Sequence, residues 1–212
     1  MIASQAIDAS SILAVRTILY NQYMTPIDYI SLFIITALFG FTVKLADLVN
    51  EHGLRLFIFD TYVFGVAWGM LGSLLILSDV GASSGAVSNA VLAMILAFIV
   101  QLRIDYLNHA IGAVMIIITF LATSALAPKI FFVFFTSFVF FGVLRAYIGD
   151  VRKQKDIWYR LSEPGWAHYY IVPFVWSWAT SQWLVFFVFA IYRSCYNIAK
   201  YGLYRVGAYS KL

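Results

Sequence analysis

The segment "DYISLFIITALFGFTVKLADLV", Asp28 to Val49, decides the fold class of this chain. It contains no charged side chain between Tyr29 and Val43, and it is long enough for a helix that crosses a bilayer, which takes about 20 residues. Lys44 and Asp47 then follow. Because a charge in or near hydrocarbon costs on the order of a few kcal/mol, such groups are expected beside a partner, a cavity or a substrate. The segment predicts a membrane-spanning helix that ends at a polar site.

The composition places the whole chain in a membrane. Of its 212 residues, 63% are hydrophobic and 11% are charged, whereas soluble domains carry about a quarter charged residues. The aromatic content of 18% suits interfacial belts. The net charge of +4 indicates orientation in the membrane and contact with anionic lipid headgroups, and no motif for nucleic-acid binding is present. We expect a multi-pass protein of a prokaryotic plasma membrane with membrane lipids as partners.

The predicted fold is an all-α, polytopic bundle of about six transmembrane helices in a single domain, residues 1–212. Residues 1–24 are expected to form an interfacial amphipathic helix, 28–148 a five-span core, 149–168 an amphipathic cytoplasmic loop, and 169–212 the last span with a basic tail. The expected spans are Asp28 to Val49, Leu56 to Ser78, Val87 to Leu107, Ala110 to Ala127, Ile130 to Ile148 and Tyr169 to Tyr192.

Basic residues orient this bundle. One side would hold Lys44, Arg55, Arg103, Arg145, Arg152, Lys153, Lys155 and Arg160, and that side is expected to be cytoplasmic. The tail after the sixth span conflicts with this, since Arg193, Lys200, Arg205 and Lys211 would fall outside. Either the rule is violated there, or Pro173 divides the last segment so that part of it re-enters without crossing.

Two span endings resemble each other. "VKLADLVNEHG" (Val43 to Gly53) and "LRIDYLNHAIG" (Leu102 to Gly112) share a basic residue, Asp-x-x-Asn, a histidine and a glycine. Three repeated two-helix hairpins around a common site would explain this, and so would the general need of helices for polar ends. A separate element, "GVAWG", brings small residues Gly65 and Gly69 onto one helix face, for packing within the chain or for a homo-oligomer.

The two endings each predict a polar stripe. Helical spacing aligns Lys44, Asp47, Asn50 and Glu51 in the first, and Gln101, Asp105, Asn108 and His109 in the second. In the second stripe, Asp105 and His109 are spaced i, i+4, which allows both side chains to hold one ion or one another. We therefore expect Asp47 and Asp105 to converge on one site.

The residue types in these stripes suggest phosphate chemistry. Asp47, Glu51, Asp105 and Asp60 are candidate ligands of a divalent cation such as Mg²⁺ or Mn²⁺, while Lys44, Arg103, Arg145 and Arg152 are candidates for binding a phosphate. The candidate catalytic residues are His109 for proton transfer, with Asp105 and Asp47. An internal lattice of salt bridges would produce the same residues, and Asp60 would then pair with Lys44, Arg55 or Arg103.

The leading hypothesis is an integral membrane enzyme, for example a transferase of lipid metabolism, that acts on a phosphate-bearing lipid or isoprenoid headgroup at the cytoplasmic face. A cation or metal-ion transporter or channel that uses the same carboxylates is the first alternative. A structural subunit of a larger membrane complex is the second. Motifs for phosphate loops, dinucleotide folds, zincins and nucleophile elbows are missing from the sequence.

Overall fold

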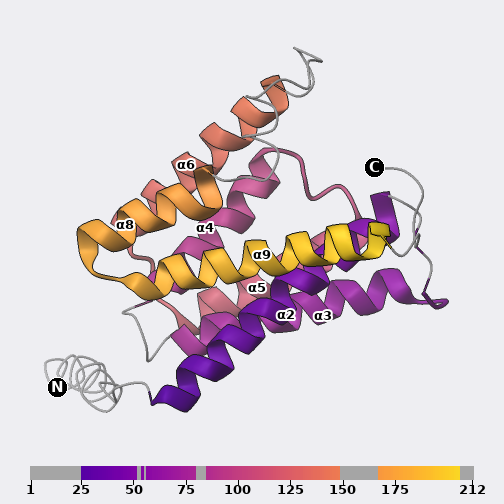
Figure 1. Ribbon diagram of the computed structural model, residues 1–212, viewed down its shortest axis with the longest axis horizontal. Coiled ribbons are helices and arrows are strands. Elements are labelled where there is room, and N and C mark those ends of the chain that lie inside the picture. The colour runs from indigo at the N-terminus through magenta and orange to yellow at the C-terminus, as the bar shows by residue number, and fades with distance from the viewer. Residues whose placement is uncertain (1–24, 52–53, 55, 80–84, 149–166, 206–212) are drawn as a thin grey trace, which may run out of the picture.

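The computed structural model describes residues 25–51, 54, 56–79, 85–148 and 167–205, without the side chains of 51, 204 and 205. Within this part the regular structure is helical, with seven α-helices and the π-helical turn η2 (Figure 1). They are α2 (Pro26–Glu51), α3 (Asp60–Asp79), α4 (Ala86–Val100), α5 (Leu107–Thr123), α6 (Pro128–Ala146), η2 (Ala167–Ile171), α8 (Val172–Thr180) and α9 (Trp183–Arg205). The all-α prediction is confirmed, while the predicted helix at 1–24 and most of the predicted loop at 149–168 lie outside the described residues.

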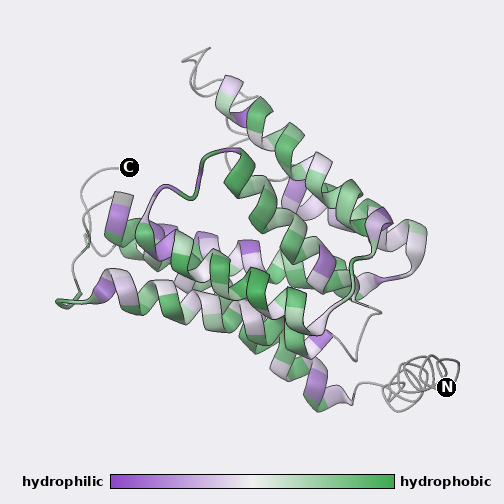
Figure 2. Cartoon of the chain, turned by 180° about the vertical axis from the view of Figure 1, so that it is seen from behind, coloured by the Kyte–Doolittle hydropathy of each residue, from purple (hydrophilic) through white to green (hydrophobic). Residues whose placement is uncertain are grey.

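Three of these helices are long and apolar enough to cross a membrane. They are α2 from Pro26 to Asn50, α3 and α6, and each matches a predicted span. The helices α4 and α5 are also apolar but shorter. Figure 2 shows hydrophobic residues along most of the helices, which is the distribution expected where lipid is the solvent.

Small residues bring α3 and α5 together, side by side and parallel. A Cβ atom on Gly65 would lie 2.9 Å from the Cα of Asn108, and one on Gly69 would lie 2.8 Å from the Cα of Gly112. "GVAWG" therefore serves the close approach of two helices of the same chain. A homo-oligomer through Gly65 and Gly69 stays a prediction, and these two glycines already face α5.

Contacts between the other helices fix their directions. The helices α2 and α9 run parallel, since Phe33 packs on Phe187 near their starts and Phe39 on Tyr192 further along. The helices α4 and α6 also run parallel, with Asn89 bonded to Ala127 and the Gln101 side chain bonded to Phe138. As a result α2, α4, α6 and α9 all end at one end of the bundle, here called the site end, where α3, α5 and η2 begin.

The predicted third span is shorter than expected. Helix α4 ends at Val100, and residues 101–106 connect it to α5 without helical structure. Its end is a Schellman motif, in which the N–H of Arg103 bonds to Phe98 O at 2.9 Å and the N–H of Leu102 to Ile99 O at 3.0 Å. Leu102 takes the left-handed conformation there, with φ 55°, a position where glycine is usual. Without a glycine at this point, the helix end carries no sequence signal.

The predicted sixth span, Tyr169 to Tyr192, is two helices. Ser181 adopts φ 62° and ends α8, after which α9 returns toward the site end. Ser177 holds the turn, because its hydroxyl donates to Gln182 O at 2.9 Å and accepts from the N–H of Phe186. Pro173 lies at the start of α8, where a missing N–H costs nothing, and so it does not break the segment.

The hairpin of α8 and α9 sets the position of two basic residues of the tail, Arg193 and Lys200. Because α9 runs parallel to α2, its Arg193 and Lys200 lie toward the same end as Lys44. The last segment is therefore divided, as one alternative expected, but the division lies at Ser181 and not at Pro173.

Candidate functional site

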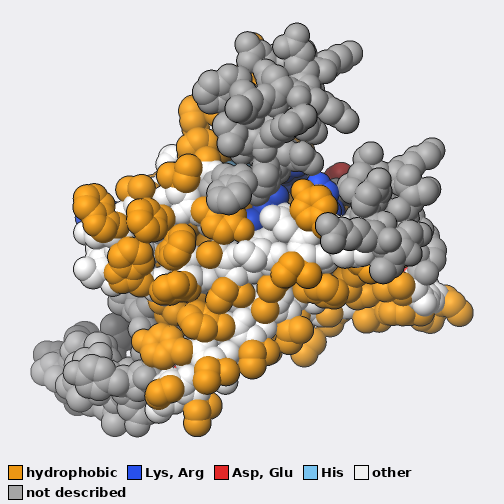
Figure 3. Space-filling view, viewed as in Figure 1, with side chains coloured by type: hydrophobic (Ala, Val, Ile, Leu, Met, Phe, Trp, Pro, Cys, Tyr) orange, Lys and Arg blue, Asp and Glu red, His pale blue; other side chains and the backbone are white. Residues whose placement is uncertain are grey.

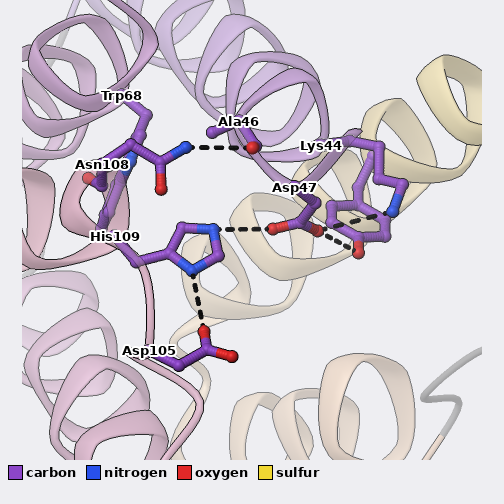
Figure 4. Close-up of polar contacts among 8 residues, drawn as sticks. Lys44, Ala46, Asp47, Trp68, Asp105, Asn108 and His109 are labelled. Carbon is purple, nitrogen blue, oxygen red and sulfur yellow. Dashed lines mark hydrogen bonds and ion pairs between the residues drawn. The ribbon is translucent and has the colours of Figure 1, made fainter. Parts of the chain in front are cut away.

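His109 lies at the site end between two carboxylates from distant parts of the chain (Figure 4). Its Nε2 is 3.0 Å from Asp47 Oδ1 on α2, and its Nδ1 is 3.7 Å from Asp105 Oδ1 on the connection before α5. The first contact is a hydrogen bond, while the second is a longer electrostatic pair. His109 is 8% exposed, whereas the Asp105 side chain is 56% exposed. The structure thus brings together the three residues proposed for catalysis, with the Asp47 side chain 13% exposed and Asp105 facing outward.

The carboxylate of Asp47 is bonded on both oxygens. Oδ1 faces His109, while Oδ2 accepts a 2.6 Å hydrogen bond from the Tyr196 hydroxyl and lies 3.5 Å from Lys44 Nζ. Its geometry suits a group that orients an imidazole and balances its charge. Lys44 is 4% exposed and forms an ion pair with Asp47, so the structure places its ammonium group as a partner of this carboxylate.

Tyr196 is the residue of this site that the sequence analysis missed. Its ring has Lys44 Nζ at 5.1 Å and the guanidinium carbon of Arg193 at 4.7 Å from the centroid, both within cation–π range. The signal was weak because Tyr196 is one of 14 tyrosines and carries no motif that distinguishes it from the others. Its role depends on the parallel packing of α9 against α2.

Asn108 fixes the position of His109. Its Nδ2 donates to Ala46 O on α2 at 2.9 Å, and its backbone oxygen accepts from the Trp68 indole on α3 at 3.2 Å (Figure 4). Asn108 is fully buried, and its Oδ1 has no hydrogen-bond partner among the described residues. Three helices are therefore joined one residue before His109, and the Oδ1 of Asn108 is buried there without a described partner.

The predicted metal ligands are only partly brought together. Asp60 is fully buried as the first residue of α3, where it accepts hydrogen bonds from the N–H groups of Leu56 and Thr61. The part of the chain that the structure describes holds no group of three or more His, Cys, Asp or Glu side chains that could bind an ion. Glu51 is the last residue of α2, and its side chain lies outside the described residues.

Three arginines surround His168 near this site. Arg103 donates to Gly142 O on α6 at 3.3 Å, Arg145 is in the last turn of α6, and Arg193 lies 5.1 Å over the ring of Tyr169. Burial, with the charges of Arg193, Arg145 and Arg103, lowers the pKa of His168 to about 3, so this imidazole is neutral. Figure 3 shows Lys and Arg side chains gathered on this face above α9. Arg152 lies outside the described residues.

The site end therefore combines two kinds of group. A buried imidazole held against a carboxylate can take up and release a proton. Guanidinium groups bind phosphate and carboxylate oxygens. The Tyr196 ring lies between the two parts, because its hydroxyl bonds to Asp47 while Arg193 covers its ring.

The chain was compared with known proteins at three levels. No known protein family matches it, no curated protein matches it, and no solved structure matches it.

Proposed function

We propose that this chain is an integral membrane enzyme that acts on a phosphate-bearing lipid or isoprenoid headgroup at the cytoplasmic face of a prokaryotic plasma membrane. The observation that carries the proposal is the largely buried pair of His109 and Asp47, 3.0 Å apart, at the same end of the bundle as Arg103 and Arg145. The excess of basic residues at this end supports the cytoplasmic orientation.

His109 is the proposed proton-transfer group. It would remove the proton from the hydroxyl of an acceptor or from water as that oxygen attacks phosphorus, and then return a proton to the leaving oxygen. Asp47 would stabilise the imidazolium that forms, as a buried carboxylate does when it faces a histidine. The unpartnered Oδ1 of Asn108 is an acceptor that a hydroxyl or water beside His109 could use.

A divalent cation is the proposed cofactor. Mg²⁺ is often bound through one or two carboxylates together with substrate phosphates, so a site without three protein ligands is compatible with it. Asp105 is the proposed ligand because its carboxylate is half exposed, whereas both oxygens of Asp47 are already engaged. Glu51 remains a proposed ligand from the sequence. Arg103, Arg145 and Arg152 are proposed to bind the phosphate. Asp60 is not included in this proposal, because its carboxylate accepts hydrogen bonds from the N–H groups of Leu56 and Thr61 at the start of α3.

The test is a turnover assay with purified protein in detergent. Short-chain lipids and isoprenoids that carry labelled phosphate are incubated with Mg²⁺, Mn²⁺ or EDTA, and the labelled products are separated by chromatography. We expect turnover that falls by about 10²-fold or more in His109→Gln, which is the usual contribution of a general base. Asp28→Asn is the matched control, because Asp28 is exposed at the far end of α2 and bonds locally to Thr25.

Two results would contradict the proposal. One is turnover in His109→Gln equal to that of the parent protein. The other is a lack of any phosphate product together with Asp47-dependent cation uptake into vesicles that contain the protein, which would favour the transporter instead.

A further inference from the structure

The cluster around His168 is built from four separate parts of the chain. His168 on η2 packs against α6, with its ring centroid 5.4 Å from Phe138 and 6.5 Å from Phe141. Arg145 follows these two phenylalanines on the same face of α6, at positions i, i+3 and i+7. His168 and Tyr169 have ring centroids 4.3 Å apart, so Arg193 over Tyr169 approaches the same place from α9.

Arg103 reaches the cluster from the connection before α5. Its Nη2 bonds to Gly142 O, one turn before Arg145 on α6. The Schellman motif at the end of α4 fixes this direction, because the N–H of Arg103 is bonded back to Phe98. Arg103, Arg145 and Arg193, together with His168, are here called the arginine cluster. Its position is therefore set by backbone contacts and aromatic packing.

From these contacts we infer that the arginine cluster is a binding site for the terminal phosphate of a lipid, a phosphomonoester or diphosphate, and that it selects against phosphodiester headgroups. The inference rests on the proposed function and narrows its substrate class. Three guanidinium groups match an anion of charge −2 or more, whereas a phosphodiester carries one negative charge and has two oxygens blocked by ester bonds. A neutral His168 adds a further nitrogen that can donate to a phosphate oxygen.

The location of the cluster fits this ligand. Arg193 contacts both Tyr169 and Tyr196, and Tyr196 bonds to Asp47, which holds His109. A phosphate at the cluster would therefore lie next to the proton-transfer pair. Arg193 is 6% exposed, and a guanidinium in such a low-dielectric place interacts with an anion more strongly than one in water does.

Binding, rather than turnover, tests the inference. The probes are dioctanoyl phosphatidic acid as the monoester and dioctanoyl phosphatidylglycerol as the diester, titrated into detergent-solubilised protein and followed by the shift in unfolding temperature. We expect the monoester to bind at least about tenfold more tightly, which corresponds to one charge-assisted contact. Arg193→Gln should remove this preference.

Lys200→Gln is the matched control, because Lys200 is a basic residue on the same helix near the same end and lies over Tyr201. It should keep the tenfold preference. Arg145→Gln is a second variant of the cluster. Arg145 is half-buried, so this change is less disruptive to folding than a change at the buried Arg193. It should also lose the preference.

Equal affinity for the monoester and the diester would overturn the inference and leave the proposed function intact. A preference that survives in both arginine variants would overturn it too. If neither lipid binds and turnover is also missing, the inference and the proposed function fall together.

Discussion

The two aspartates that face His109 should differ sharply in their importance for stability. Asp47 contacts His109 at 3.0 Å, Tyr196 at 2.6 Å and Lys44 at 3.5 Å, and its side chain is 13% exposed. Asp105 lies 3.7 Å from the same imidazole with 56% of its side chain exposed. We therefore compare Asp47→Asn with Asp105→Asn, two changes that keep the shape of the side chain and remove one charge.

The burial of each pair sets the expected magnitude. Removing one partner of a buried pair costs about 3 to 5 kcal/mol, since the remaining charge stays in a low dielectric, whereas an exposed pair contributes about 0.2 to 1 kcal/mol. In a chain of this size, 1 kcal/mol shifts the midpoint of thermal unfolding by about 2 to 4 °C. Asp47→Asn should lower the midpoint by about 6 to 20 °C, and Asp105→Asn by no more than about 4 °C.

Thermal unfolding in detergent, followed by circular dichroism, measures both variants. The double variant shows whether the two aspartates act on one histidine, because contacting residues couple by about 0.5 kcal/mol or more. Equal losses in the two single variants, or a larger loss for Asp105→Asn, would refute the assignment of Asp47 as the buried partner of His109. With Mg²⁺ added, a gain in midpoint that Asp105→Asn abolishes would support the proposed cation ligand.

Three further predictions follow from the packing and charges. Gly112→Ala should destabilise the protein by about 1 to 3 kcal/mol, because the new Cβ would collide with the Trp68 ring. Gly202→Ala is the control, because nothing lies near its Cβ, and it should stabilise α9 by up to about 1 kcal/mol. If thermal unfolding shows comparable effects for the two variants, the close packing of α3 on α5 is contradicted. The pKa of His168 is lowered from 6.5 to about 3, so between these pH values the unfolded chain binds one more proton than the folded chain. The free energy of unfolding should therefore be highest above pH 6.5 and fall below it, by up to about 1.4 kcal/mol per pH unit. His168→Gln should flatten this slope between about pH 6.5 and 5, and an unchanged slope would count against a neutral buried imidazole. In a Cys195→Ser background, cysteines at Ala125 and Tyr201 should react with an impermeant reagent from opposite sides of the membrane, and labelling from one side only would exclude the parallel arrangement of α2 and α9.

The amino-acid sequence determined the class of the fold and part of the site. Long apolar runs such as Tyr29 to Val43 leave few alternatives to a membrane helix, because lipid cannot satisfy exposed backbone groups. Local spacing also placed Asp105 next to His109, and the shared Asp-x-x-Asn endings indicated that Asp47 belongs to the same site. These features depend on neighbours along the chain, and the sequence displays such neighbours directly.

Tertiary structure alone decided the rest. Leu102 and Ser181 take left-handed conformations without the glycine that would mark them, so the end of α4 and the turn before α9 have no local signal. That turn sets α9 parallel to α2, which brings Tyr196 onto Asp47 and Arg193 to His168 across long separations in sequence. Such contacts depend on the direction of whole helices, and a change of direction at one residue alters every pairing beyond it.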